Sequence, residues 1–415
     1  MRQLQDLFDK QIQDQLRFSV FIADVIESEL RKRDIHLTVE QKQQLIKKLE
    51  KNKDSLNDSM SIQINDDGSI EITNGGGESD FELDLLDSAK LKMNALLENF
   101  PSIINDASDA ESEKYLRNIK KRTSSILKEN SKHQKNLNKQ LDKKWGKLLD
   151  LLEIFVVLSE DVGAEFTDCV INSLSEDTSP RLIVLSHSHA RSCQVAKEII
   201  TLLRNGFADG ADARWRTLHE MAVETNIINR NDDELAKKYI DHDLVHKWKT
   251  AKAFSEYDQE FSGGIITKEE LQDLEIASEK LVKLYGKDFL NENGWAVGLT
   301  GRPRTRFSDL ESLAKFAHLR PAYKMACLNV HGGARGLFFR LGLRYDGDEN
   351  FLLTGPSING LANPIQNTAY SLLQITTALL TYDVNLDYLV AMKVLFKLEQ
   401  EIFEVTSEIV EKYYD

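Results

Sequence analysis

Apolar side chains recur every three or four residues along most of this chain, the spacing of a helix with one buried face. In the first third of the chain the apolar positions alternate with long charged stretches, and proline is rare. The expected helices there occupy residues 3–33 (as one or two helices), 38–53, 80–99 and 110–149. Thr38 and Gln41 have the spacing of a capping box at the start of the second of these helices.

One segment of this first third has a different period. Ile62, Ile64, Ile70 and Ile72 alternate with polar residues on either side of an Asp-Asp-Gly sequence. Alternation with period two, interrupted by a turn sequence, is typical of two paired strands. The sequence therefore predicts a short β-hairpin near residues 61–73.

From about residue 147 the expected helices become more apolar. They occupy residues 147–159, 162–174, 180–205, 209–230, 232–257, 268–286, 308–318, 321–341, 365–382 and 384–413, with loops at 287–307 and 343–363. The predicted fold class is mainly α. A charged helical arm, residues 1–146, carries the hairpin, and a helical-bundle domain, residues 147–415, contains most of the apolar side chains.

The charge of the chain limits its partners. A net charge of −14 and a pI near 5.3 disfavour non-specific binding to nucleic acid. Residues 111–149, however, carry twelve Lys or Arg against four Asp or Glu. This stretch is either a solvated helix face or an arm that binds nucleic acid or a protein partner.

Composition also indicates a cytoplasmic protein. The beginning of the sequence lacks the apolar stretch of a signal peptide, and the most apolar run, residues 148–158, is too short and too charged to span a membrane. Three widely spaced cysteines indicate neither a disulfide framework nor a zinc site. Because no Walker or Rossmann glycine motif is present, we expect no cofactor.

The first candidate for chemistry is the segment from Arg214 to Glu220, near the start of an apolar helix. Arg216 and Glu220 are four residues apart and share a face, and His219 lies beside them. Two interpretations are open. The charges form a structural ion pair between helices, or the arginines bind phosphate while His219 or Glu220 handles protons.

Two further segments are candidates. Asp241 and His242 lie on the next expected helix, with His246 one turn later; two histidines at this spacing need a third ligand to hold a metal, so we assign binding roles and no metal. Tyr323 and His331 lie farther along, where His331 precedes two glycines and is either a helix cap or a catalytic base.

An arginine-rich loop completes the set of candidates. Arg302, Arg304 and Arg306 lie in a Gly/Pro sequence and cannot all be core residues. They are either simply solvated or contact a phosphate backbone or an acidic partner.

Taken together, these segments resemble a known family. The set Arg216-x-Leu218-x-Glu220, Tyr239 to His242, Trp295 and Tyr323 to His331-Gly332 is similar to a large bacterial helical family of unknown function, whose members often lie beside defence or mobile-element genes. The resemblance covers roughly residues 180–340. The helical layout of that family is similar in turn to HEPN domains, many of which are metal-independent ribonucleases with an Arg-x4-6-His motif.

This resemblance implies a function. Arg214 and His219 fit Arg-x4-His, although Trp215 departs from the small polar residue usual after the arginine. His219 would then activate a ribose 2′-hydroxyl or protonate the leaving oxygen, and an arginine would stabilise phosphate charge. The implied protein is a homodimeric, RNA- or nucleotide-acting effector of antiviral defence or of a toxin system. The alternative is a non-enzymatic helical scaffold or sensor whose N-terminal arm binds a protein partner encoded in the same operon.

Overall fold

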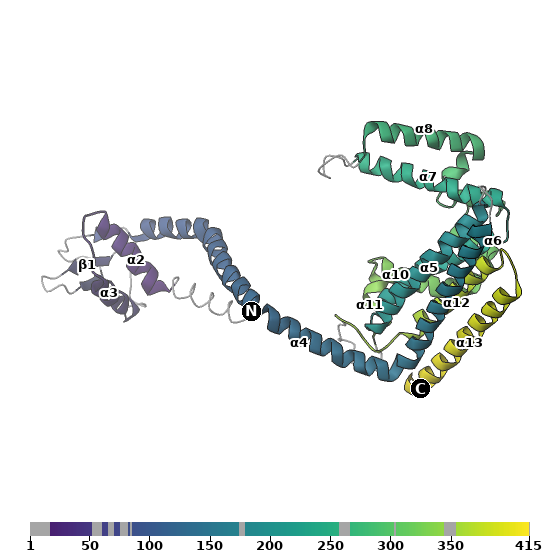
Figure 1. Cartoon of the computed structure of the whole chain (residues 1–415). Helices are drawn as coiled ribbons and strands as arrows, with labels where there is room; N and C mark the ends of the chain where they lie inside the picture. The colour runs from purple at the N-terminus through teal and green to yellow at the C-terminus, as the bar shows by residue number, and fades with distance from the viewer. Residues whose placement is uncertain are drawn as a thin grey trace. The chain divides into compact units, whose positions relative to one another are not determined.

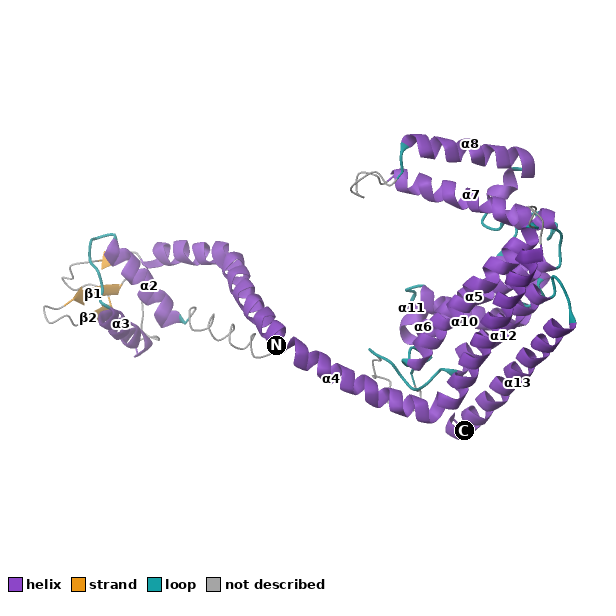
Figure 2. Cartoon of the chain, viewed as in Figure 1, coloured by secondary structure: helices purple, strands orange, loops and turns teal. Residues whose placement is uncertain are grey.

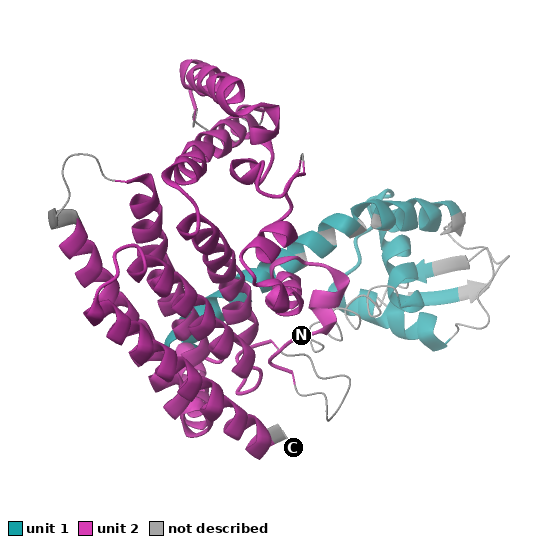
Figure 3. Ribbon diagram, turned by 90° about the vertical axis from the view of Figure 1, so that its right-hand side faces the viewer, with its two compact units in different colours: residues 1–126 teal, residues 127–415 magenta. Residues whose placement is uncertain are grey.

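The computed structural model describes residues 17–51, 60–64, 70–74, 82–83, 85–173, 179–256, 266–302, 304–343 and 354–414. The chain divides into two compact units, residues 1–126 and residues 127–415, which we call unit 1 and unit 2 (Figure 3). Helices dominate both units, and the described strands all lie in unit 1 (Figure 2). The predicted mainly α fold class is therefore confirmed. The predicted domain boundary at residue 146 stays a prediction.

Unit 1 is a small two-layer structure. Its elements before the long helix are α2 (Phe18–Arg31), α3 (Val39–Lys51), β1 (Met60–Ile64), β2 (Ile70–Asn74) and β3 (Glu82–Leu83). The capping box forms at the start of α3, where the Thr38 hydroxyl accepts from the Gln41 backbone at 3.2 Å. Phe21, Ile26 and Leu45 are among the apolar side chains that fill the core between α2 and α3.

The hairpin prediction is confirmed. Strands β1 and β2 pair antiparallel, with Ile62 opposite Ile72 and Ile64 opposite Ile70. A third strand, β3, pairs on the other side of β1, so the sheet order is β2-β1-β3. The sequence predicted helix from residue 80, which is wrong for Glu82 and Leu83, because a strand of two residues is too short to show a period.

A single helix replaces four predicted ones. Helix α4 runs from Leu85 to Ser173 without interruption and contains Pro101 (Figure 1). The predicted breaks near residues 100–109 and 160–161 are therefore wrong. Polar stretches there lower the apolar periodicity but do not end the helix, because they contain neither glycine nor another proline. Residues 127–173 of α4 belong to unit 2, where Trp145 and Leu148 are fully buried.

Unit 2 is a helical bundle around a large apolar core. Its helices after α4 are α5 (Pro180–Arg204), α6 (Ala208–Asn229), α7 (Asp233–Glu256), α8 (Lys268–Tyr285), α9 (Phe307–Leu313), α10 (Arg320–Val330), α11 (Ala334–Phe338), α12 (Ala362–Leu380) and α13 (Leu386–Tyr414), with 3-10 helices η2 (Lys287–Leu290), η3 (Gly294–Ala296) and η4 (Ala317–Leu319). The predicted single helix over 321–341 is wrong, because the chain breaks at His331-Gly332-Gly333 and continues as α11.

Helix α12 is the centre of the bundle. Its sequence carries no charged residue, and Ile365, Leu372 and Leu379 are fully buried. Two tryptophans connect the surrounding segments through hydrogen bonds: the Trp215 indole donates to Ser371 Oγ at 3.0 Å, and the Trp145 indole donates to the Ile358 carbonyl at 2.8 Å. Fully buried indole groups with satisfied N–H groups fix the relative positions of α6, α12 and α4 within unit 2.

None of the described helices has a sufficiently long and apolar stretch to cross a lipid bilayer.

A close backbone approach in unit 2 gives the first prediction. A Cβ atom at Gly294 would lie 1.9 Å from the carbonyl oxygen of Phe289. We expect Gly294→Ala to lower the free energy of unfolding by about 1–3 kcal/mol, since the backbone next to buried Trp295 must shift. A Cβ at Gly332 meets nothing within 4 Å, so Gly332→Ala is the matched control. Urea denaturation measures both; equal stabilities would contradict this packing.

Candidate functional site

Helix α6 carries a row of polar side chains on an otherwise apolar helix. Its members recur at intervals of three or four residues and therefore lie along one face: Asp209, Asp212, Arg216, Glu220 and Glu224. Charged groups inside a bundle are costly unless each has a partner. The partners come mainly from α10, which runs antiparallel to α6: Asn329 contacts Asp212, and Tyr323 contacts Arg216 and Glu220.

Tyr323 is at the centre of the largest cluster. Its hydroxyl donates to Glu220 Oε1 at 2.5 Å and accepts from Arg216 Nε at 3.1 Å. Arg216 Nη2 also contacts Glu220 Oε1, at 2.8 Å. Burial, together with the hydrogen bond to Glu220, raises the pKa of the Tyr323 phenol, so the hydroxyl remains protonated. The predicted i, i+4 pair on α6 is therefore present, and Tyr323 joins it.

Two arginines lie against the Tyr323 ring. The guanidinium carbons of Arg216 and Arg320 are each 5.4 Å from the ring centroid. Their side chains are 28% and 32% exposed, so both guanidinium groups reach solvent. We call these two guanidinium groups and the ring between them the Arg–Tyr–Arg cluster. Arg320 is not among the residues predicted from the sequence, because its distance of 104 residues from Arg216 hides the contact.

Behind this cluster, Arg320, Glu311 and His219 form a series of contacts that leads into the core, which we call the buried chain. Arg320 Nη1 donates to Glu311 Oε2 at 2.7 Å, and His219 Nε2 is 3.0 Å from Glu311 Oε1. The side chains of Glu311 and His219 are 1% and 0% exposed. Trp215, Phe307, Phe316 and Tyr323 place their rings around His219. The His219 imidazole is therefore enclosed by protein side chains and contacts Glu311, and its catalytic role stays a prediction.

Arg214 takes part in another contact. Its Nε pairs with Glu198 of α5, and its Nη1 lies 3.4 Å from the Thr217 hydroxyl. Arg214 and His219 are five residues apart and thus about 140° apart around α6. The Arg-x4-His spacing therefore does not bring these two side chains to one site within the chain.

Asp241 and His242 hold the helices beyond α6 together. The Asp241 carboxylate accepts from Tyr285 of α8 at 2.7 Å and from Lys237 at 3.0 Å. His242 is buried, and its Nε2 lies 3.0 Å from the carbonyl oxygen of Asn291. Burial lowers the pKa of the His242 imidazole. These contacts attach α7 to α8 and to the loop after η2, so the structure gives both residues structural partners.

The three loop arginines differ from one another. Arg302 Nη1 pairs with Asp309 at 2.9 Å, and the Arg306 backbone donates to the same carboxylate at 2.9 Å, which anchors the start of α9. The residues Arg304 and Arg306 are exposed. Within the described residues, no hydrogen bond, ion pair or ring contact joins any of the three to the Arg–Tyr–Arg cluster.

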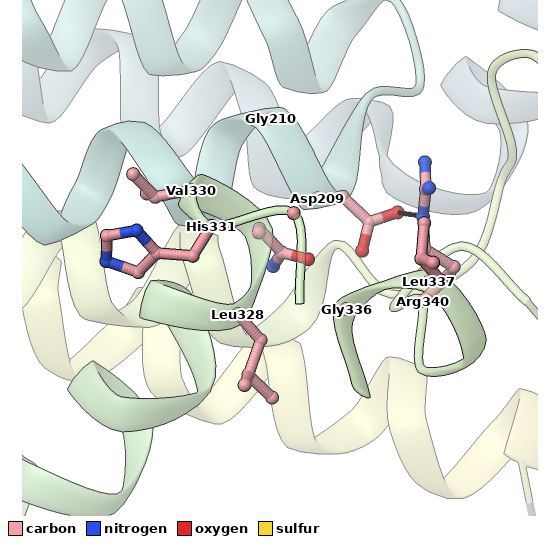
Figure 4. A pocket seen from close by; sticks show the side chains of 10 residues that line it. Asp209, Gly210, Leu328, Val330, His331, Gly336, Leu337 and Arg340 are labelled. Atoms are coloured by element: carbon pink, nitrogen blue, oxygen red, sulfur yellow. Dashed lines mark hydrogen bonds and ion pairs between the residues drawn. The ribbon is translucent and has the colours of Figure 1, made fainter. Parts of the chain in front are cut away.

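A cavity of about 340 Å³ lies where α6 begins and α10 ends (Figure 4). Asp209 and Arg340 pair across it at 3.3 Å, and the Leu341 backbone donates to Asp209 at 2.7 Å. His331 also lines the cavity, but its ring points away from that pair (Figure 4). His331 is exposed and has no side-chain partner among the described residues. Its imidazole therefore remains available to a ligand.

Two carboxyls, buried Asp212 and half-buried Glu224, were missed at the level of sequence. Asp212 is 4% exposed and accepts from Asn329 Nδ2 at 3.3 Å, while Glu224 accepts from the Tyr239 hydroxyl at 2.8 Å. Burial raises the pKa of each to about 7. Asp212 and Glu224 are four and eight residues from Arg216, so helical spacing alone could have placed them on the same face of α6. Their contacts with α10 and α7, however, could not be predicted from that spacing.

Comparison with known proteins covers this same region. Residues 182–350 match the model of a family described as a family of unknown function, DUF5677. The match includes the polar row of α6, the Arg–Tyr–Arg cluster and His331, and it extends over less than half of the chain. No curated protein matches the chain. No solved structure matches it either. The match supports an uncharacterised domain at this position, as the sequence resemblance predicted.

The buried position of Glu311 generates a stability prediction. Glu311→Ala leaves His219 and Arg320 without their shared carboxylate. We expect the free energy of unfolding to fall by about 3–5 kcal/mol, because a buried charge pair is broken. Glu234→Ala removes an exposed pair with Lys238 and should cost about 0–1 kcal/mol. Guanidinium denaturation measures both variants. An equal loss of unfolding free energy in the two would contradict a stabilising role for the buried contacts of Glu311.

The raised pKa values of Asp212 and Glu224 generate a prediction about pH. A carboxyl with a higher pKa in the folded state stabilises the protein at low pH, and that contribution is lost as pH rises through the folded pKa of about 7. Asp212→Asn cannot ionise. Relative to the wild type, it should gain roughly 2–3 kcal/mol of stability between about pH 5 and pH 8.

Denaturation at several pH values measures this difference, with exposed Glu234→Gln as the control that follows the wild type. A difference between Asp212→Asn and the wild type that stays constant from pH 5 to pH 8 would show that Asp212 ionises normally.

Proposed function

We propose that this protein is a metal-independent RNA-cleaving effector of prokaryotic antiviral defence, and that unit 2 binds the RNA on the face formed by α6 and α10. The observation that carries the proposal is the Arg–Tyr–Arg cluster. Two partly exposed guanidinium groups are held against one tyrosine ring, each by a carboxylate on the protein side.

The two arginines keep donors for a ligand. Arg216 uses Nε and Nη2 for Tyr323 and Glu220, and Arg320 uses Nη1 for Glu311. The remaining N–H groups of both have no partner among the described residues. A guanidinium with free N–H groups suits phosphate oxygens, because its planar fork can donate two parallel hydrogen bonds. Exposed Lys324, next to Tyr323 on α10, adds a further positive charge.

The carboxylates give these arginines fixed positions. Glu311 is itself held by His219, and Glu220 by Tyr323. Donors that are already oriented bind phosphate oxygens of the RNA with little loss of side-chain freedom. His219, in this proposal, acts through Glu311 on Arg320 and does not contact RNA.

His331 supplies the proton transfer. It lies eight residues after Tyr323, or about 12 Å along the line of α10, which is a rise of about 1.5 Å per residue. Its exposed imidazole takes the proton of a ribose 2′-hydroxyl, and the oxygen then attacks the neighbouring phosphorus atom. The bond to the 5′-oxygen breaks, and that oxygen takes a proton from water. The products are a 2′,3′-cyclic phosphate and a 5′-hydroxyl.

The role in defence has a separate support. It comes from the resemblance of residues 180–340 to a family whose members lie beside defence genes, and the matched family carries no stated activity. A non-enzymatic scaffold or sensor is the alternative, and the experiment below distinguishes the two.

The prediction concerns induced expression in a bacterial host. We expect growth arrest and RNA fragments that end in 2′,3′-cyclic phosphate. His331→Ala should lower cleavage by about 100-fold or more, the loss typical of one acid–base group. Arg216→Ala should lower cleavage at limiting RNA by about 10-fold or more, because one charged hydrogen-bond donor to the phosphate backbone is lost. Arg302→Ala, which removes a paired arginine from the loop before α9, is the matched control and should cleave normally.

Thermal melts show whether each variant is folded. We expect His331→Ala to melt like the wild type, because His331 is exposed and its replacement removes no core packing. Full cleavage by folded Arg216→Ala and His331→Ala would contradict the proposed site. Intact RNA after expression of the wild-type chain would contradict cleavage altogether and favour the scaffold.

A further inference from the structure

Acidic and basic residues are segregated along residues 98–128 of α4. Residues 98–113 contain five acidic residues and no Lys or Arg: Glu98, Asp106, Asp109, Glu111 and Glu113. Residues 114–128 contain six basic residues and no Asp or Glu: Lys114, Arg117, Lys120, Lys121, Arg122 and Lys128. The sign of the charge changes between Glu113 and Lys114. Mixed pairs three or four residues apart, the usual way to stabilise an isolated helix, are therefore absent within each stretch and occur where the two meet, as between Glu111 and Lys114.

The same part of α4 exposes a stripe of large apolar side chains. Its members lie within about 60° of one another around the helix: Leu97, Ile104, Tyr115, Ile119 and Ile126. They are 38–63% exposed. Between them on this face lie small residues, including Ser108 and Ser112. A helix with no buried face is only marginally stable in water, and an apolar stripe at this spacing is typical of a helix that pairs with another helix.

We propose that residues 97–126 of α4 pair antiparallel with the same residues of a second copy of this chain, about a two-fold axis between Glu113 and Lys114. An antiparallel pair places the acidic stretch of each helix beside the basic stretch of the other. Asp109 and Lys120 lie on the same flank of the apolar stripe, so Asp109 of each copy then lies near Lys120 of the other. Because the interface is isologous, each favourable pair occurs twice.

The apolar stripe matches itself about the same axis. Ile119 faces Ser108 of the second copy, Tyr115 faces Ser112, and Ile126 faces Pro101. Each large side chain thus meets a small one, which lets the helices approach closely and the side chains interlock. The axis that aligns the acidic stretch of each helix with the basic stretch of the other therefore also places these large and small side chains opposite one another.

Other occupants fit less well. A parallel pair would place acidic beside acidic and basic beside basic side chains. RNA would be repelled by residues 98–113 and would leave the apolar stripe uncovered. An acidic protein would cover only the basic stretch. The pairing rests on unit 1 and is independent of the proposed RNA cleavage, which rests on unit 2.

The experiment measures the mass of the full chain by sedimentation equilibrium over a range of concentrations. The wild type should be a dimer that weakens as salt rises from about 0.05 M to about 0.5 M, since screening shortens the reach of the charges. Lys120→Glu, Lys121→Glu and Arg122→Glu together should weaken it by about 100-fold or more, because several favourable pairs become repulsive.

A second set of changes tests the complementarity itself. Asp106→Lys, Asp109→Lys and Glu113→Lys, added to the first three substitutions, reverse both stretches and should restore the dimer. Lys252→Glu, Lys280→Glu and Lys283→Glu replace three exposed lysines of α7 and α8 and are the matched control. They change the net charge as much as the first triple variant does and should leave the dimer intact.

Cross-linking tests the direction of the pair. In a Cys169→Ser background, a short bis-maleimide should join a Ser108→Cys chain to an Ile119→Cys chain more readily than it joins two Ile119→Cys chains. A monomeric wild type, or a dimer that survives the first triple variant, would overturn the proposal. Failure of the six-fold variant to dimerise, or preferential linking of Ile119→Cys to itself, would overturn it as well.

Discussion

The buried carboxylate of Glu311 is the constraint on which the polar face of unit 2 depends. It lies out of contact with water between the His219 imidazole and the Arg320 guanidinium. A charge in such a place needs both partners, so α9, which carries Glu311, fixes the distance between α6 and α10. That distance in turn sets Tyr323 against Arg216. The exposed cluster is thus the outer end of a chain of contacts that begins in the core.

Hydrogen bonds between tyrosine and carboxylate recur in this bundle. Tyr323 donates to Glu220, Tyr239 to Glu224, and Tyr285 to Asp241. Each bond gives an acidic group on α6 or α7 a neutral hydrogen-bond donor from a different helix. Only at Tyr323 do two arginines join the pair. The tyrosine–carboxylate contact between α7 and α8 therefore leaves no arginine N–H groups directed to solvent, whereas the face of α6 and α10 exposes N–H groups of Arg216 and Arg320.

Much of the fold could be predicted from the sequence, because it follows from local periodicity. The apolar spacing located α5, α6, α7, α12 and α13 closely, and alternation located the β1–β2 hairpin. The continuity of α4 could not be predicted, since its polar stretches weaken the pattern without ending the helix. The pair Arg216 and Glu220 was predicted from its spacing, and Tyr323 was predicted as a separate candidate. The contact of Tyr323 with that pair, and the pairing of His219 with Glu311 across 92 residues, depend on packing between helices that no local sequence pattern records.

The most direct test of the account is the binding of a single-stranded RNA to the full chain at several salt concentrations. If Arg216 contacts a phosphate, Arg216→Gln should weaken binding and make the dependence of log K on log salt less steep by about 0.7. Arg302→Gln should leave both unchanged. An Arg216→Gln variant with the affinity and salt dependence of the wild type would contradict the assignment of the α6–α10 face as the RNA-binding surface.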